Sequence, residues 1–249
     1  MSQAKLHTKP TLHPLIDTHG HYVFGVDDGA ASLDMAVEMV RMAQAQGVTD
    51  IICTSHDQAR RECYLPNLAA LTDRLQQEGI LVRLYPGCEI YCTQYTFPTI
   101  LEQLHQGQLP PMGNSKYVLL EFHPYVEPGD LLYFVNQVRK QTEFLPIVAH
   151  IERYFILQEE PAALDVLRQW EIPIQINAYS LVEEHDDRIR GFARKVLAEQ
   201  RVTFIGSDAH RTTHRPPKVA KGMEYIYQTC DEAYARAVCY ENACRLLLG

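Results

Sequence analysis

The chain has 249 residues, a formal net charge of -8 and 46% hydrophobic residues. This length suits a single α/β barrel domain with a substantial core. The negative charge disfavours nucleic acid or an anionic membrane as the main partner, and no apolar run approaches the roughly 20 residues that span a bilayer. Seven cysteines, an odd number without a disulfide framework, are typical of a reducing compartment. We therefore expect a cytoplasmic protein with free thiols and no membrane insertion.

The first strand is followed by a candidate metal site. Residues 1–14 lack the apolar segment of a signal peptide and are predicted to form a flexible leader. A strand over 15–19 ends at His19, and His21 lies two positions further on, so both imidazoles share one face. Asp27 and Asp28 follow within a few residues, and Gly25 and Gly29 allow a tight turn there. Two aligned imidazoles beside a carboxylate predict a divalent metal site, and exposed histidines after an edge strand are the alternative.

Strands and helices alternate along the rest of the chain. The predicted strands cover residues 15–19, 48–53, 80–85, 117–122, 146–149, 172–176 and 202–205. The predicted helices cover residues 33–46, 67–77, 97–105, 130–141, 161–170 and 186–199, with two or three more in 217–248. Ser32 and Asn67 are expected to cap the first two helices. Alternation implies parallel strands with right-handed crossovers, and seven strands favour a closed or nearly closed barrel over an open sheet.

Every predicted strand leads to a side chain that can bind metal or make hydrogen bonds. These residues are His19, His21, His56, Glu89, Glu121, His150, Asn177, Asp208 and His210. Because the carboxyl ends of barrel strands converge on one face, we expect them to meet there. A single histidine after a strand is readily explained as an ordinary loop residue. Ligating or polar side chains at the ends of all seven predicted strands are not explained in this way. Mixed imidazole and carboxylate ligands favour Mn²⁺, Fe or Zn²⁺, and more than one ion suits phosphoester hydrolysis by a metal-bridged hydroxide.

Two arginines follow these strand ends closely. Arg153 lies three residues after His150, and Arg215 lies five residues after His210. Arginine binds phosphate through two parallel hydrogen bonds and stabilises developing charge, although exposed surface positions are the alternative for both. Asp28 or His210 could supply a proton near the leaving oxygen.

Cysteine motifs offer a competing phosphatase chemistry that we reject. Cys230–Arg236 and Cys239–Arg245 have the C-x5-R spacing of a thiolate phosphatase loop. Both segments have a helical pattern and carry acidic residues beside the thiol, whereas such a loop needs glycine-rich backbone amides and a thiolate of low pKa. Cys88 and Cys92 are expected to be packing residues.

With these residues in view, the chain resembles the polymerase and histidinol phosphatase (PHP) family. The branch it is most similar to is that of the bacterial capsule-operon CpsB/YwqE-type manganese-dependent protein-tyrosine phosphatases. The resemblance runs through residues 17–21, 25–30, 54–56, 87–90, 120–122, 148–153, 175–178, 206–210 and 241–243. The sequences GVDDGA and HIER point to this branch rather than to histidinol phosphatases.

The resemblance implies one PHP-type domain over residues 15–249, folded as a distorted (β/α)7 barrel with three divalent ions. Mn²⁺ is expected, with Fe or Zn²⁺ as alternatives. The implied ligand sets are His19, His21, Glu89 and Asp208; Glu89, Glu121 and His150; and Asp28, His56 and His210. Arg153 and Arg215 would bind substrate phosphate. The implied partner is a tyrosine-phosphorylated protein, the tail of a bacterial autokinase that controls polysaccharide export, and the oligomeric state is left open.

Four positions depart from the family pattern. Ser55 and Ile151 replace expected prolines, Asp57 replaces an expected histidine, and His123 is an added imidazole. None of these changes removes a ligand, but they alter the shape of the predicted pocket. Two other functions therefore stay open: a small-molecule phosphatase, such as one for histidinol phosphate or a nucleotide, and a metal-binding regulatory module without turnover.

Overall fold

A computed structural model describes residues 14–182 and 186–249, so the predicted leader lies outside it except for its last residue. The strands are β1 Leu15–Gly20, β2 Val48–Cys53, β3 Arg83–Pro86, β4 Glu89–Tyr91, β5 Tyr117–Glu121, β6 Leu145–Val148, β7 Gln175–Asn177 and β8 Phe204–Gly206. The α-helices are α1 Leu33–Gln44, α2 Arg61–Gln77, α3 Phe97–His105, α4 Pro128–Gln141, α5 Phe155–Glu159, α6 Ala162–Gln169, α7 Asp187–Ala198, α8 Ala220–Thr229 and α9 Glu232–Arg236. Short helical turns are η1 Ile151–Arg153, η2 Ala178–Leu181, η3 Ala237–Glu241 and η4 Cys244–Leu248. None of these helices is long and apolar enough to cross a membrane.

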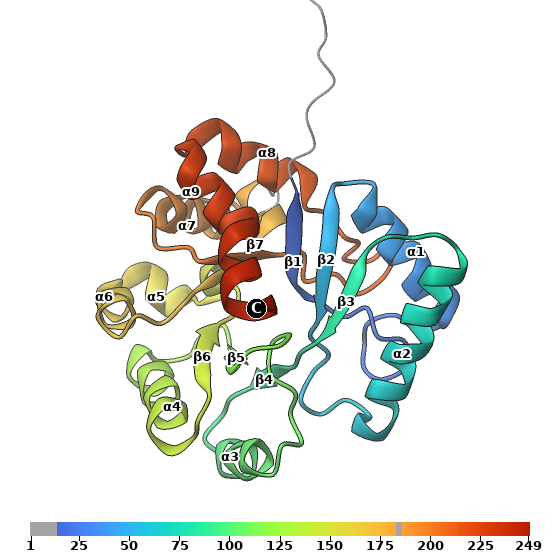
Figure 1. Cartoon of the computed structure of the whole chain (residues 1–249). Helices are drawn as coiled ribbons and strands as arrows, with labels where there is room; N and C mark the ends of the chain where they lie inside the picture. Colours follow the sequence, from blue (N-terminus) through green and yellow to red (C-terminus); the bar gives the residue numbers. More distant parts are fainter. Residues whose placement is uncertain (1–13, 183–185) are drawn as a thin grey trace, which may run out of the picture.

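The strands form three parallel sheets rather than one. Their orders are β1-β2-β3, β4-β5-β6 and β7-β8. Single bridges link the sheets, from Gly20 to Ala209, from His56 to Glu89 and from Val148 to Ile174. The predicted α/β class with parallel strands is confirmed, whereas the described residues form no continuous closed sheet, and the (β/α)7 barrel stays a prediction. Figure 1 shows the strands at the centre of the molecule with the helices around them.

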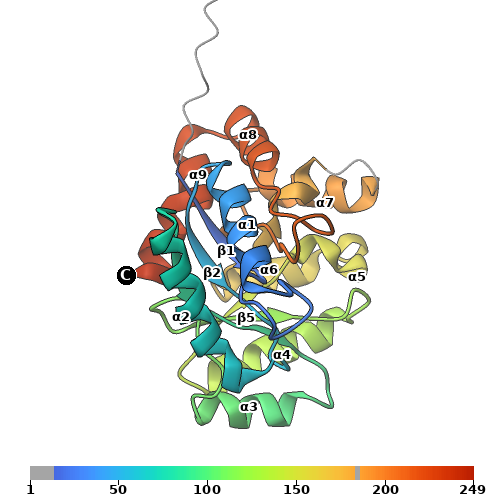
Figure 2. The same ribbon diagram turned by 90° about the vertical axis from the view of Figure 1, so that its right-hand side faces the viewer.

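The apolar side chains lie in two layers. The larger cluster fills the space between the strands and the surrounding helices, such as α1 and α2, which flank β2 and β3 (Figures 1 and 2). The smaller cluster lies on the inner side of the strands and includes Ile16, Ile52, Leu119, Ile147 and Phe204. Ala243 and Leu247 of the C-terminal segment pack onto this cluster. The inner layer closes one end of the strand group, so the polar strand ends face the other end.

Local signals predicted most of the elements, and three of the differences change the order or number of elements or a helix start by several residues. The helix expected to begin at Asn67 begins at Arg61 and continues through Pro66. Asn67 caps nothing, because its amide donates to the backbone oxygen of Phe24 at 2.8 Å. The strand expected over 80–85 runs over 83–86 and is separated from β4 by Gly87 and Cys88, so residues 14–182 and 186–249 form eight strands where seven were expected. The third difference is α5, a short helix that was not expected.

Candidate metal centre

Glu89 occupies the middle of the candidate site. It is the first residue of β4, and its carboxylate is buried. Oε1 lies 3.2 Å from Nε2 of His19 and 3.0 Å from Nε2 of His150. Oε2 lies 3.2 Å from Nε2 of His21 and 3.4 Å from Nδ1 of His56. Burial opposes ionisation of this carboxyl, but the imidazoles of His19, His150 and His21 outweigh it and hold the pKa of Glu89 well below its usual range.

All nine predicted ligands come together around this carboxylate. Four groups have ligand atoms within 4.8 Å of one another: His21, Asp28, His56 and His210; His19, Glu89 and His150; His19, His21 and Asp208; and His56, Glu89 and Glu121. The groups share members, as a multinuclear site requires. They draw on the carboxyl ends of β1, β2, β5, β6 and β8 and on the start of β4.

The donor set fits divalent ions. The Nε2 atoms of His19 and His21 are buried and have no hydrogen-bond partner among the described residues. In each ring the other nitrogen is engaged, with Asp27 for His21 and Gln175 for His19, so Nε2 is the nitrogen left to bind an ion once the ring has lost its extra proton. Buried polar atoms without partners are rare in folded proteins. An ion would satisfy both nitrogens at once.

Asp27 and Gln175 orient these two rings, a role that was not predicted for either residue. Asp27 Oδ2 lies 2.8 Å from Nδ1 of His21, and the same carboxylate accepts from the backbone of His56 and Gly29. Gln175 Oε1 lies 3.4 Å from Nδ1 of His19 and accepts from the backbone of His150 at 2.7 Å. Such outer partners fix the ring orientation and the tautomer of a ligating histidine. The available sequence signals were the adjacent acidic pair at 27–28 and the QIN motif at 175–177.

Two arginines converge on Asp208. Arg153 Nη1 lies 2.9 Å from Asp208 Oδ2, and Arg215 Nη2 donates to the same oxygen. Burial disfavours the carboxylate, but Arg153, His19 and Arg215 hold the pKa of Asp208 well below its usual range. Arg153 also donates to the hydroxyl of Tyr179. The Nε atom of Arg215 is buried and has no hydrogen-bond partner among the described residues.

His210 is held in a neutral form. Burial, His21 and Arg215 together lower the pKa of His210 to about 3. Its Nδ1 lies 3.0 Å from the backbone oxygen of Asp208, and Nη1 of Arg215 lies 2.9 Å from its Nε2. We therefore assign the proton to Nδ1 and the lone pair to Nε2, 3.5 Å from Oδ2 of Asp28. This tautomer suits a metal ligand better than an acid.

Backbone strain marks the same centre. His150, Asp208 and Arg215 have φ values of +24°, +51° and +53°, in the left-handed region that side chains with a β-carbon rarely adopt. Each such residue costs roughly 1–3 kcal/mol, which the surrounding packing must offset. Strain at three residues of one cluster indicates that their side-chain directions serve a function.

Other polar candidates lie apart from the centre. His123 is exposed, belongs to none of the four groups, and its Nδ1 accepts from the backbone of Tyr125 at 3.2 Å. Cys88 and Cys92 are free and belong to the apolar core, in agreement with the packing role expected for them. Burial raises the pKa of Cys230, and it raises that of Cys239 to about 12. A thiolate mechanism at the C-x5-R segments is therefore disfavoured.

A cavity of about 310 Å³ opens beside the candidate metal centre. It is lined by Val26, Asp27, Asp28, His56, Asp57, Gln58, Ala59, Tyr91 and Glu121. Asp57 and Gln58 also line a neighbouring cavity of about 240 Å³ that extends to Tyr95. Carboxylates dominate the first cavity, so an anionic substrate would be repelled unless cations reverse the local sign.

Comparisons with known proteins give consistent results. The family model described as "Capsular polysaccharide synthesis, CpsB/CapC" matches residues 15–248. A tyrosine-protein phosphatase CpsB of Streptococcus agalactiae is 28% identical over 243 residues, which cover 94% of this chain and 98% of the relative. A putative tyrosine-protein phosphatase CapC of Staphylococcus aureus is 30% identical over 210 residues, covering 81% and 79%.

Solved structures add a similarity of fold. The crystal structures of YwqE from Bacillus subtilis and CpsB from Streptococcus pneumoniae are described as unique metal-dependent tyrosine phosphatases. The match to them has a TM-score of 0.79 at 25% identity and covers 89% of this chain and 90% of the matched chain. A histidinol phosphate phosphatase from Lactococcus lactis shares the fold at 16% identity, with a TM-score of 0.57 and coverage of 86% and 92%.

Proposed function

We propose, from the premise that this chain belongs to the CpsB/CapC family of capsular polysaccharide synthesis proteins, that it is a metal-dependent hydrolase of phosphotyrosine in proteins. The observation that carries the proposal is the set of four overlapping ligand groups around Glu89. The relatives named as tyrosine-protein phosphatases support the reaction, and the solved metal-dependent phosphatases support the cofactor. The proposal includes a PHP-type (β/α)7 barrel over residues 15–249 and a cytoplasmic location, which seven free cysteines support.

Three divalent ions are proposed, with Mn²⁺ expected and Fe or Zn²⁺ as alternatives. Their proposed ligands are His19, His21, Glu89 and Asp208 for the first, Glu89, Glu121 and His150 for the second, and Asp28, His56 and His210 for the third. When bound, such ions supply Lewis-acid stabilisation and activate water as a nucleophile. Imidazole and carboxylate together favour these metals over Ca²⁺ or Mg²⁺, which prefer oxygen ligands.

The proposed role of Arg153 and Arg215 is to bind the phosphoryl oxygens. Both guanidinium groups meet at Asp208, and the buried Nε of Arg215 has no described partner. Fixed donors of this kind stabilise the charge that develops on phosphoryl oxygens during hydrolysis. Tyr179 holds the guanidinium of Arg153 through its hydroxyl, which makes it a positioning residue.

Departure of the tyrosine side chain needs little acid catalysis, because phenolate is a comparatively good leaving group. Asp28 is the most exposed of the proposed ligands, with 60% of its side chain accessible, and it lines the cavity beside the centre. It is the proposed group for placing a proton near the leaving oxygen. His210 was the other candidate for this role, but its neutral Nδ1–H tautomer favours ligation over acid catalysis.

The adjoining cavities suit a phosphotyrosine within a chain better than a compact metabolite. The aryl ring would enter the cavity lined by Val26, Ala59 and Tyr91, and flanking residues would continue past Gln58 toward Tyr95. An exposed tyrosine-phosphorylated tail, such as that of a bacterial tyrosine autokinase, is therefore the proposed substrate.

The test is release of phosphate by the full-length protein loaded with Mn²⁺. We expect turnover of a phosphotyrosine peptide, with a higher kcat/KM than for histidinol phosphate, and its loss on chelation. His150→Ala should abolish activity, because it removes a proposed ligand, whereas the matched control His123→Ala should retain it. If the metal-loaded protein has no activity, only a non-catalytic metal-binding role is left. If kcat/KM is equal for the two substrates, the proposed preference for phosphotyrosine in proteins over small molecules is wrong.

A further inference from the structure

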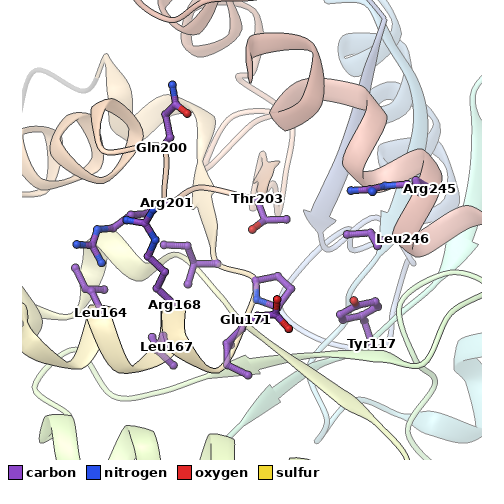
Figure 3. A pocket seen from close by; sticks show the side chains of 13 residues that line it. Tyr117, Leu164, Leu167, Arg168, Glu171, Gln200, Arg201, Thr203, Arg245 and Leu246 are labelled. Atoms are coloured by element: carbon purple, nitrogen blue, oxygen red, sulfur yellow. The ribbon is translucent and has the colours of Figure 1, made fainter. Parts of the chain in front are cut away.

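A second cavity, of about 430 Å³, lies at the end of the strands opposite the metal centre. It is lined by residues at or before the starts of three strands, with Tyr117 beginning β5, Ile174 preceding β7 and Thr203 preceding β8. Helix α6, the segments that follow α6 and α7, and η4 supply the other walls (Figure 3). The same three strands lead to Glu121, Asn177 and Asp208 at their other ends, so the cavity is separate from the centre described above.

Three guanidinium groups line this cavity. They belong to Arg168, Arg201 and Arg245. Among residues 14–182 and 186–249, no carboxylate pairs with Arg168, and Arg245 donates to the amide oxygen of Asn242 at 3.4 Å. Arg201 pairs with two surface carboxylates, but its Nη1 is buried without a described partner. Glu171 is the one carboxylate in the lining. A positive lining in a chain of net charge -8 favours an anionic ligand.

Two further lining residues hold disfavoured backbone conformations. Glu171 and Gln200 follow the ends of α6 and α7 with φ values of +55° and +52°. At the equivalent positions after α2 and α3, the chain has Gly79 and Gly107, the residue that suits this conformation. Of the five described non-glycine residues with positive φ, three lie at the metal centre, and these two line the cavity.

A carboxylate and an amide at positions where glycine would be less strained suggest a use for their side chains in the cavity. Carboxylate and amide oxygens accept hydrogen bonds from hydroxyl groups, and an amide also donates. The position of Glu171 matches this role, because it lies between two chemically different ends of the cavity. Figure 3 shows Arg168 and Arg201 on one side of it and Tyr117, Leu246 and Arg245 on the other.

We propose that this cavity binds a nucleoside diphosphate or a close analogue with the same phosphate, hydroxyl-bearing and planar parts. Arg168 and Arg201 would bind the phosphates, Glu171 would accept from the sugar hydroxyls, and the planar ring would pack on Tyr117 and Leu246. Guanidinium groups match phosphate geometry, and aromatic rings stack on bases. The volume lies within the usual range for small-molecule sites, roughly 300–1,000 Å³.

The only tryptophan of the chain provides a local signal. Trp170 lies directly before Glu171 at the end of α6, and the Arg139 guanidinium is 5.4 Å from its ring centroid. The full-length protein, kept free of metal, would be titrated with α,β-methylene ADP, whose bridging P–C–P bonds resist hydrolysis, and with inorganic phosphate, while tryptophan fluorescence is recorded. We expect a saturable change with the nucleotide and a much weaker one with phosphate.

Two cavity variants test the assignment. Arg168→Ala should weaken nucleotide binding by about tenfold or more, since it removes a charge-assisted contact. Glu171→Gly should weaken it as well while keeping or raising the thermal stability, because glycine relieves the positive φ. This second variant separates loss of binding from loss of folding.

His150→Ala is the matched control at the other end of the strands. It should leave the nucleotide titration unchanged, so that this proposal and the phosphatase proposal can fail independently. The inference is overturned if no saturable change occurs, or if both cavity variants bind the nucleotide as the unsubstituted chain does. It is also overturned if inorganic phosphate binds as tightly as the nucleotide, which would make the cavity an adventitious anion site, or if His150→Ala abolishes the signal.

Discussion

Asp27→Asn tests whether orientation of a ligating histidine controls metal affinity. Asp27 Oδ2 lies 2.8 Å from Nδ1 of His21, and the carboxylate also accepts from the backbone N–H groups of Gly29 and His56 at 3.0 and 3.1 Å. Asparagine keeps the shape and one acceptor oxygen but removes the charge. The substitution therefore isolates the electrostatic part of the support that Asp27 gives to His21.

The size of the effect follows from these contacts. A hydrogen bond that involves a charged group contributes about 1.5–3 kcal/mol, and about 1.4 kcal/mol corresponds to a factor of ten in affinity. We expect Asp27→Asn to weaken Mn²⁺ binding by about 10–100-fold, the usual range for loss of such a partner. Asp27→Ala should in addition destabilise the fold, because two backbone donors lose their acceptor.

The assay is titration of metal-free protein with Mn²⁺ in competition with a chelator, followed by phosphatase measurements at saturating metal. Asp57→Asn is the matched control, because Asp57 is also largely buried and lines the same cavity but accepts from the backbone of Tyr91 instead of a histidine. We expect the control to bind metal as the unsubstituted chain does. Equal losses in both variants, or no loss in Asp27→Asn, would refute the reasoning.

Three further outcomes are expected. In the metal-free protein, hydrogen bonds to carboxylates outweigh burial and raise the pKa of His21 to about 10 and that of His150 to about 9. Both imidazoles are therefore protonated at pH 8, and binding of Mn²⁺ at this pH should release about two protons. For the same reason the affinity for Mn²⁺ should fall as the pH falls. Calorimetry in buffers of different ionisation enthalpy measures this release, and its absence would contradict the assignment. Tyr179→Phe removes the hydroxyl that holds one site arginine, so we expect KM for a phosphotyrosine peptide to rise about tenfold with little change in kcat; steady-state kinetics showing the opposite split would argue against a positioning role. Gly222→Ala places a β-carbon 2.1 Å from a backbone oxygen of η2, so the free energy of unfolding should fall by about 1–3 kcal/mol, whereas Gly191→Ala, which meets no atom within 4 Å, should leave a denaturation midpoint unchanged or higher.

Local sequence signals predicted much of the element order. The strand over 48–53 and the helix over 97–105 have the predicted bounds, and Ser32 caps α1 by accepting from the backbone of Met35. These elements are bounded by glycine, proline or a capping hydroxyl, which act within a few residues. The order of elements then determines where strand ends lie, which is why distant ligands could be expected on one face.

Elements whose bounds depend on tertiary contacts were predicted less well. Asn67 was expected to cap a helix, but the helix begins at Arg61, five residues before Pro66, and tolerates the hydrogen bond that the proline cannot make. The strands expected to begin at 172 and 202 begin at Gln175 and Phe204 instead. Ile172 and Thr203, which belong to the expected strands but precede β7 and β8, line the second cavity.

The same distinction separates proposed ligands from the residues that support them. A ligand such as Glu89 could be anticipated because its position at a strand end follows from chain topology. Asp27 and Gln175 could not be assigned, because the ring each one orients depends on side-chain reach across the site. Glu171 and Gln200 were harder still to anticipate, since a sequence indicates positive φ mainly through glycine. Where a residue other than glycine has positive φ, the conformational strain can be seen only in the structure. Such strain suggests that the side chain at that position has a use.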